Sequence, residues 1–179
     1  MQSETLLRYT KPAADFNSAL PIGNGRIGGM VFGDPSSELI RLNEDSVWSG
    51  GLRHRINPDA QEGLKEVRRL LAEGDIPAAE KAAFSKMQGV TPNMRHYMPL
   101  GDLHIDMELT GKARDYLRTL DIAQAFTEVS FTVNDVRYTR KAFVSAPDEV
   151  MVVHITADQP GSVTLTASID GRDDYYDDN

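Results

Sequence analysis

The stretch that decides the fold is Gly101-Asp102-Leu103-His104-Ile105-Asp106-Met107-Glu108-Leu109. Its apolar residues occupy every second position, and polar or charged residues occupy most of the positions between them. Successive side chains of a β-strand point to opposite faces, so this alternation is typical of a strand with one face against a core and one face in water. Residues 101–109 therefore predict part of a half-buried antiparallel sheet.

The same period returns further along the chain. Alternating apolar residues recur at Val129, Phe131 and Val133, and again at Val163, Leu165, Ala167 and Ile169. Asn134 and Asp135 stand where a tight turn would join two strands. Residues 150–153 are continuously apolar and predict a strand that lies deeper in the sheets. Residues 38–42 predict one more strand near the start of the chain.

The glycine-rich stretch over residues 19–33 contains the spacing Gly-x-Gly-x-x-Gly, which dinucleotide sites also use. Such a site needs a buried strand before the first glycine and a helix that begins at the third. Here Pro21 interrupts the approach, and residues 28–32 continue through a β-prone run that leaves no room for a helix. Glu44 and Asp45 lie near the expected acidic position, so the dinucleotide alternative stays open. The favoured interpretation is a glycine-rich turn that enters a strand.

The first of two helical patterns follows Asn57, a good N-cap, and Pro58, which suits the first helical position. Its apolar stripe consists of Ala60, Leu64, Val67 and Leu71. Gly74 is expected to end this helix.

The second helix is expected to begin at Asp75 and to end at Gly89. Its apolar stripe consists of Ala79, Ala83 and Met87. Strands before, helices in the middle and strands after predict a mainly β chain, an antiparallel β-sandwich with a helical hairpin insertion at about residues 57–89.

Composition limits the function classes. The 179 residues are enough for one well-buried core. The net charge of −8 argues against a nucleic-acid partner, because binding phosphates requires clustered Lys and Arg. No apolar run approaches the roughly 18 residues of a membrane span, so no membrane partner is expected. The chain has no cysteine, which excludes disulfides and thiolate sites.

The C-terminal residues 171–179 are rich in aspartate and contain little apolar surface. Aspartates can bind calcium, but the spacing of a calcium-binding loop is missing here. We interpret this segment as a solvated acidic tail or a truncated linker, outside a sandwich domain of residues 1–170.

A search for catalytic motifs finds no G-x-S-x-G, no P-loop and no H-E-x-x-H. His104 and Asp106 share one face of the predicted strand, but two ligands are too few for a metal site. A glycosidase needs two carboxylates about 5 to 10 Å apart, a distance that spacing in sequence cannot supply. Glu44 and Asp45 attract interest because they share a turn with Trp48. A capped turn with a buried Trp explains them equally well.

Several motifs then occur together in one order. They are Pro12-Ala13, residues 19–28 (ALPIGNGRIG), residues 42–51 (LNEDSVWSGG), Asn57-Pro58, residues 99–103 (PLGDL), Tyr138-Thr139-Arg140 and Ser145-Ala146-Pro147-Asp148. In this combination the chain resembles the N-terminal domain of glycoside hydrolase family 95. The resemblance covers nearly the whole chain.

Family 95 is known for inverting α-L-fucosidases, some of which prefer α-L-galactosides. The resemblance implies a β-sandwich of the supersandwich type, then a linker and an (α/α)6 barrel that carries the catalytic residues. None of those residues has a counterpart here, so the chain is expected to be catalytically silent alone. Its implied partners are its own C-terminal barrel and fucosylated or related oligosaccharides, with no cofactor and no metal. A periplasmic or secreted location is implied, although the chain begins without a signal peptide.

Polar and aromatic residues concentrate in the predicted turns, where binding residues tend to gather. The candidates for substrate binding at the rim of the active site are Asn24, Arg26, Asn43, Glu44 and Trp48. A structural interpretation stands beside this one: the asparagines hold turns, Glu44 pairs with Arg26, and Trp48 fills an interdomain core. Two other classes remain open, an independent carbohydrate-binding module and, third, an oxidoreductase.

Overall fold

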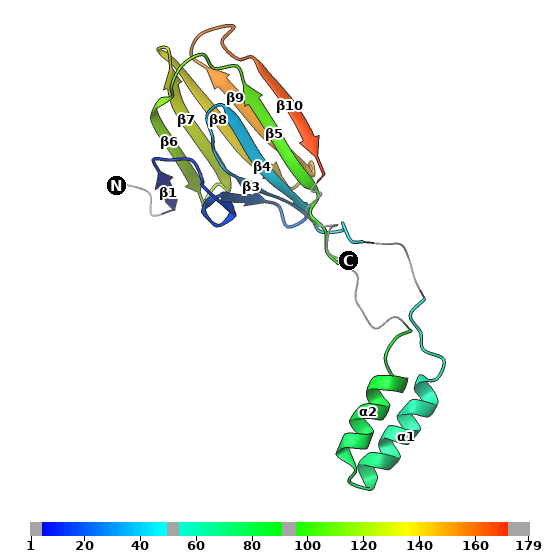
Figure 1. Ribbon diagram of the computed structural model, residues 1–179. Helices are drawn as coiled ribbons and strands as arrows, with labels where there is room; N and C mark the ends of the chain where they lie inside the picture. The colour runs from blue at the N-terminus through cyan, green and yellow to red at the C-terminus, as the bar shows by residue number, and fades with distance from the viewer. Residues whose placement is uncertain (1–4, 50–53, 91–95, 172–179) are drawn as a thin grey trace. The chain divides into compact units, whose positions relative to one another are not determined.

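The computed structural model describes residues 5–49, 54–90 and 96–171 (Figure 1). The chain divides into two compact units, one made of the residues before Trp48 and after Tyr97, the other of residues 48–97. The first unit is a sandwich of two antiparallel sheets, and the second contains two helices. The predicted fold class, an antiparallel β-sandwich with a helical hairpin insertion, is confirmed.

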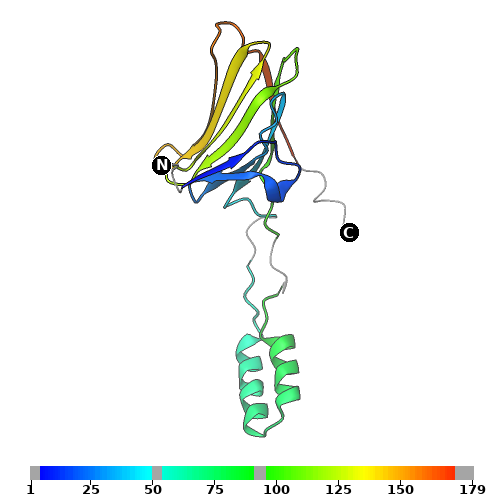
Figure 2. The ribbon, with the colours of Figure 1, turned by 90° about the vertical axis from the view of Figure 1, so that its left-hand side faces the viewer.

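Each sheet of the sandwich has five strands, and Figure 2 shows the two sheets as separate layers. The first sheet has the order β1-β6-β7-β8-β9 and contains β1 (Leu6–Tyr9), β6 (Arg114–Asp121), β7 (Phe126–Val133), β8 (Val136–Ser145) and β9 (Val150–Ala157). The second has the order β10-β5-β4-β3-β2 and contains β2 (Leu20–Gly23), β3 (Ile27–Val31), β4 (Ser37–Glu44), β5 (Gly101–Met107) and β10 (Leu165–Asp170). A short 3-10 helix, η1 (Phe16–Ser18), precedes β2.

The core lies between the sheets and follows the alternation of the sequence. Ile105 and Met107 of β5 are buried, as are Val129, Phe131 and Val133 of β7. The strand over residues 38–42 is confirmed within β4. The tight turn between β7 and β8 is also confirmed, because its two central residues have φ angles of 49° and 64°, as a type I′ turn requires.

The strands β9 and β10 differ from the predictions. Residues 163–169 were expected to be half-buried, but β10 begins only at Leu165 and all six of its residues are exposed. Residues 150–153 were expected deep in the sheets, but β9 contains no fully buried residue, and Val150 is 47% exposed. Each of these strands is the last of its sheet, so neighbouring strands cover only one side of it.

The glycine-rich stretch forms a hairpin. Gly23 ends β2 and Ile27 begins β3, and the two strands are antiparallel. A dinucleotide site needs a helix that begins at the third glycine, but here Gly28 lies in strand β3. The dinucleotide interpretation is therefore wrong. Pro21 is tolerated because β2 is an edge strand. Gly29 permits close packing, since a Cβ there would lie 2.8 Å from the Cε of Met151.

Helices α1 (Ala60–Ala72) and α2 (Ile76–Lys86) form the predicted hairpin. Asp75 caps α2, since its side chain accepts a hydrogen bond from the Ala78 N–H at 3.1 Å, and Gly74 with φ 78° follows α1. The start of α1 was predicted too early: Asp59 occupies the N-cap position. The Asn57 side chain instead accepts a hydrogen bond from the Asp59 N–H at 2.9 Å, which forms a turn before the helix.

The two helices contact each other through only part of the predicted stripes. The buried residues of this contact are Leu70, Ala79 and Ala82. Leu71 and Met87 were placed in the stripes but are 49% and 38% exposed. The contact runs through Gly63, where a Cβ would lie 2.7 Å from the Cβ of Lys86, so the helices approach closely at this row. Val67 and Ala79 of the predicted stripes pack in this contact, whereas Leu71 and Met87 lie outside it.

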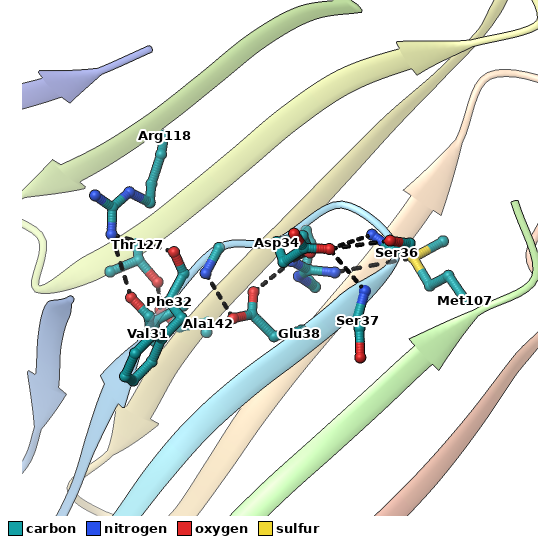
Figure 3. Close-up of polar contacts among 12 residues, drawn as sticks. Val31, Phe32, Asp34, Ser36, Ser37, Glu38, Met107, Arg118, Thr127 and Ala142 are labelled. Atoms are coloured by element: carbon teal, nitrogen blue, oxygen red, sulfur yellow. Dashed lines mark hydrogen bonds and ion pairs between the residues drawn. The ribbon is translucent and has the colours of Figure 1, made fainter. Parts of the chain in front are cut away.

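A buried ion pair connects the two sheets of the sandwich. Glu38 on β4 accepts a charged hydrogen bond from Arg140 on β8, and their side chains are 0% and 3% exposed. The Gly33 N–H donates to Glu38 at 2.6 Å, and Arg140 donates to the carbonyl oxygen of Asp34 at 2.7 Å. Figure 3 shows Glu38 and Asp34 in this network. Burial raises the pKa of Glu38, and the charge of Arg140 opposes this shift.

Arg118 is a second buried cation, on β6. It donates to the carbonyl oxygens of Ser18 at 3.0 Å and Phe32 at 3.3 Å. Figure 3 shows Arg118 near Val31 and Phe32. The hydroxyl of Tyr116 donates to the carbonyl oxygen of Gly33 at 2.7 Å, and burial raises the pKa of this phenol. Side chains of the first sheet therefore satisfy backbone carbonyls of the segment that joins β3 to β4.

Candidate functional site

The candidate residues begin in the turn between β2 and β3. The side-chain oxygen of Asn24 accepts hydrogen bonds from the N–H groups of Arg26 at 3.0 Å and Ile27 at 2.8 Å. Its amide nitrogen donates to the carbonyl oxygen of Ser145 at 3.0 Å. Gly25 has φ 94°, a backbone conformation that a side chain rarely permits. Asn24 thus holds the turn and connects it to the end of β8 in the other sheet.

Arg26 bridges two glutamates. Its Nε lies 2.9 Å from Glu44 Oε1, and its Nη1 lies 2.7 Å from Glu149 Oε2. The side chains of Arg26 and Glu149 are about half exposed, whereas that of Glu44 is 13% exposed. The Arg26–Glu44–Glu149 cluster therefore joins the β2–β3 turn, the end of β4 and the β8–β9 turn.

Glu44 is held as an anion. Its Oε2 accepts hydrogen bonds from the N–H of Ser46 at 2.9 Å and from the Ser46 hydroxyl at 2.6 Å. The hydrogen bonds from Ser46, together with the one from Arg26, lower the pKa of Glu44 to about 2. A general acid needs a pKa near the working pH. Glu44 therefore suits a binding or structural role and does not suit proton donation.

Asn43 lies apart from this cluster. It precedes Glu44 in β4, where successive side chains point to opposite faces of the sheet, and it is exposed beside Gly28 of β3. The sequence places Asn43 and Glu44 together, but the strand separates them. The structural interpretation that Asn43 holds a turn is wrong, because this residue is inside a strand.

Trp48 belongs to the second unit and pairs there with Tyr97. The two residues form an isolated antiparallel bridge, and their ring centroids are 5.1 Å apart at 72°, an edge-to-face arrangement. Trp48 is 45% exposed and Tyr97 is 36% exposed. The N–H of Ser49 donates to the carbonyl oxygen of His96 at 2.9 Å, which closes the same pair of segments. Trp48 is therefore half-exposed in the described unit.

The first unit offers the hydrogen-bonding groups of the Arg26–Glu44–Glu149 cluster, and the second unit, taken by itself, offers the partly exposed rings of Trp48 and Tyr97. Both glutamates of the cluster are paired with Arg26, so neither is free to act as an acid–base catalyst. Within residues 5–49, 54–90 and 96–171, no three His, Asp or Glu side chains gather closely enough to hold a metal ion. No helix in those ranges is long and apolar enough to cross a membrane.

Sequence reasoning missed four residues that complete these contacts: Ser46, Tyr97, Ser145 and Glu149. Glu149 lies over one hundred positions from Arg26, so no local pattern could connect them. A positive φ of 53° at this non-glycine residue marks an unusual turn, but the sequence does not reveal it. Of the predicted acidic tail or truncated linker over residues 171–179, residues 172–179 lie outside the described residues.

Comparison with known proteins gives three relatives. The chain is 35% identical to "Alpha-L-fucosidase 2" of Arabidopsis thaliana, in an alignment over 93% of this chain and 20% of that protein. It is 31% and 28% identical to proteins named "Probable alpha-fucosidase A" from Aspergillus niger and Aspergillus oryzae, over 78% and 79% of this chain. The chain spans about one-fifth of the length of these relatives.

One family description also matches, "Glycosyl hydrolase family 65, N-terminal domain", over residues 7–179. The match extends from β1 to the C-terminal end and so includes both sheets and the helical insertion. The chain therefore belongs to the family of glycosyl hydrolase family 65 N-terminal domains.

Proposed function

We propose that the parent protein is an inverting glycoside hydrolase of the family 95 type that acts on α-L-fucosides, and that this chain is its non-catalytic N-terminal domain. The observation that carries the proposal is the 35% identity to an α-L-fucosidase along 93% of the chain. Residues 1–170 form the sandwich domain in this proposal, and the catalytic barrel belongs to the remainder of the polypeptide.

The open side of the sandwich supports packing against that barrel. Leu165, Ala167 and Ile169 of β10 pair with Met107, Ile105 and Leu103 of β5, so they lie on the core-facing side of the sheet. Leu165 is nevertheless 39% exposed and Ile169 is 68% exposed. A core-facing apolar row that remains in water costs roughly 25 cal/mol per Å² relative to burial. Packing of the barrel against this row would recover that free energy.

Asn24, Arg26, Asn43, Glu44 and Trp48 remain candidates for the rim of the active site. Arg26 is the strongest of them, because half of its side chain is exposed while Glu44 and Glu149 hold its orientation. A fixed guanidinium can donate hydrogen bonds to sugar hydroxyls. Asn24 is the weakest, since both ends of its side chain are already bonded within the fold.

A substrate panel tests the proposal. The full-length protein is incubated with p-nitrophenyl α-L-fucoside, α-L-galactoside, α-D-glucoside and β-D-galactoside, and initial rates are compared. We expect the α-L-fucoside to be cleaved fastest, with α-L-galactoside as the second substrate, and no cleavage by the 179-residue chain alone. Faster cleavage of the D-glycosides would contradict the proposed substrate class.

An independent carbohydrate-binding module is the second candidate, because Trp48 and Tyr97 are both partly exposed. Their edge-to-face geometry offers no flat pair of rings for stacking, which weakens this alternative. Titration of the 179-residue chain with fucosylated oligosaccharides distinguishes the two. In a calorimetric titration, saturable binding that disappears in Trp48→Ala supports a module. If no heat of binding is measured, a structural domain is supported.

A further inference from the structure

The helical hairpin has an apolar face that neither of its helices covers. Leu71 and Ile76 are each 49% exposed, Met87 is 38% exposed, and Phe84 is 70% exposed. Exposed apolar residues that occur singly are normal, whereas a contiguous set indicates a docking surface. Leu71, Ile76 and Phe84 lie within the two short helices, and Met87 is the C-cap residue of α2.

Helix geometry places these residues on one side of the hairpin. Each residue turns the helix by about 100°, so Leu64 and Leu71 lie one such step beyond the contact residues Gly63 and Leu70. On α2, Ala83 lies one step beyond the contact residue Ala82. In an antiparallel pair, equal rotation in both helices leads to the same side of the pair.

The other residues of the stripe on α2 follow from Ala83. Ile76 and Met87 are seven positions before and four positions after it, spacings that share one helix face. Phe84 lies at the outer edge of this face. We define the hairpin apolar face as Leu64, Leu71, Ile76, Ala83, Phe84 and Met87.

The opposite side of α1 is charged. Lys65 pairs with Glu62 at 2.7 Å, and Arg69 pairs with Glu73 at 2.6 Å, all with well-exposed side chains. A helix with one charged side and one apolar side normally places the apolar side against a core. The contact with α2 uses only part of the apolar side of α1, so the rest requires another surface.

We propose that the hairpin apolar face docks on an apolar surface in the part of the parent polypeptide outside this chain. The inference rests on the proposed function, because it assumes a longer enzyme. It deepens that function by assigning the helical insertion as an interdomain anchor. The length of the relatives supports it, since about four-fifths of the Arabidopsis protein lies outside the alignment.

The size of the face also favours a covalently linked partner. Two helices about 20 Å long and about 10 Å apart present roughly 400 Å² on one side. A stable interface between free proteins buries about 800 Å² on each partner. A dimer through this face alone would therefore be weak, whereas a partner in the same polypeptide has a high effective concentration.

Photo-crosslinking in the full-length protein tests the proposal. The photoreactive residue p-benzoylphenylalanine replaces Leu71, and cross-linked peptides are identified by mass spectrometry after irradiation of a mixture of isotopically light and heavy protein. The matched control places the same residue at Arg69, which is exposed on the same helix but on its charged side. We expect position 71 to cross-link to peptides outside residues 1–179, and position 69 to give few such products.

Three results would overturn the inference: cross-links from position 71 into the sandwich residues 5–47 or 98–171, cross-links between light and heavy copies, or equal products from positions 71 and 69. A second measurement is independent of the photoreaction. Leu71→Glu should lower the thermal midpoint of the full-length protein more than Arg69→Glu does. Fucosidase activity of the same preparations separates the two proposals. Cross-linking without activity contradicts the proposed function alone. Activity without cross-linking contradicts the docking alone.

Discussion

Replacement of Arg140 by methionine tests how the sandwich is held together. The substitution keeps an apolar stem but removes the guanidinium that donates to Glu38 and to the Asp34 carbonyl. Glu38 is fully buried, so its carboxylate would lose its charge partner without gaining water. Breaking a buried pair from one side costs about 3–5 kcal/mol. A domain is typically stable by about 5–15 kcal/mol, so the loss is a large fraction of the total.

Urea unfolding followed by far-ultraviolet circular dichroism measures this loss. Lys141→Met is the matched control, because Lys141 is the next residue in β8 and forms a half-exposed pair with Glu128 at 3.2 Å. Exposed pairs contribute about 0–1 kcal/mol, so the control should be nearly neutral. A loss below about 1 kcal/mol for Arg140→Met would refute the reasoning, since the buried pair would then contribute no more to the free energy of unfolding than an exposed pair does.

Two further measurements exclude simple misfolding as the explanation. In Arg140→Met the buried carboxylate of Glu38 can become neutral only by binding a proton. The difference in free energy of unfolding between wild type and Arg140→Met should therefore shrink as the pH falls. The double variant Glu38→Met/Arg140→Met removes both charges and should recover most of the stability, since apolar replacements of buried pairs are often neutral. If the double variant is as unstable as Arg140→Met, the buried charge is not the cause.

Three more predictions concern the turns. Gly33→Ala should destabilise by more than about 1 kcal/mol in urea unfolding, because φ is 86° and a Cβ would lie 2.6 Å from the Cδ of Arg118; Gly25→Ala, with φ 94° and open space, should cost less. The folded-state pKa of Glu44 is about 2, below its ordinary value, so Glu44 stabilises above about pH 4.5 and loses this effect as the pH falls towards 2; the difference in thermal midpoint between wild type and Glu44→Gln should vanish in that window. Arg26→Ala in the full-length enzyme should raise KM if Arg26 contacts substrate; unchanged kinetics with a lower thermal midpoint would assign it a structural role alone.

The sequence predicted the fold well wherever alternation and burial agree. Phe131 and its neighbours in β7 follow a period of two because one face of that strand meets the core. The same alternation over residues 163–169 predicted a buried face that β10 lacks, because periodicity reveals sides of a strand but not its position in the sheet. Whether a strand lies at the edge or in the centre of its sheet depends on pairing with strands that are distant in sequence.

The candidate site was predictable only in part. The pairing of Arg26 with Glu44 was expected in the structural interpretation, and it follows from the pairing of β3 with β4, which places Ile27 opposite Glu44. Glu149 could not be expected, because a distant loop brings it to Arg26. Asn43 was grouped with Glu44 although a strand sends adjacent side chains to opposite faces. In the hairpin, the spacing predicted which residues share an apolar stripe but not what each contacts: Val67 packs between the helices, whereas Leu71 is 49% exposed.

The stereochemistry of the product tests the central claim most directly. The full-length protein is mixed with a fucosylated oligosaccharide in an NMR tube, and the anomeric proton signals of released fucose are recorded in the first minutes, before the anomers equilibrate. We predict that β-L-fucose appears first, as an inverting α-L-fucosidase requires. Initial release of α-L-fucose would contradict the inverting mechanism, and absence of any released fucose would contradict the assignment of this chain to a fucosidase.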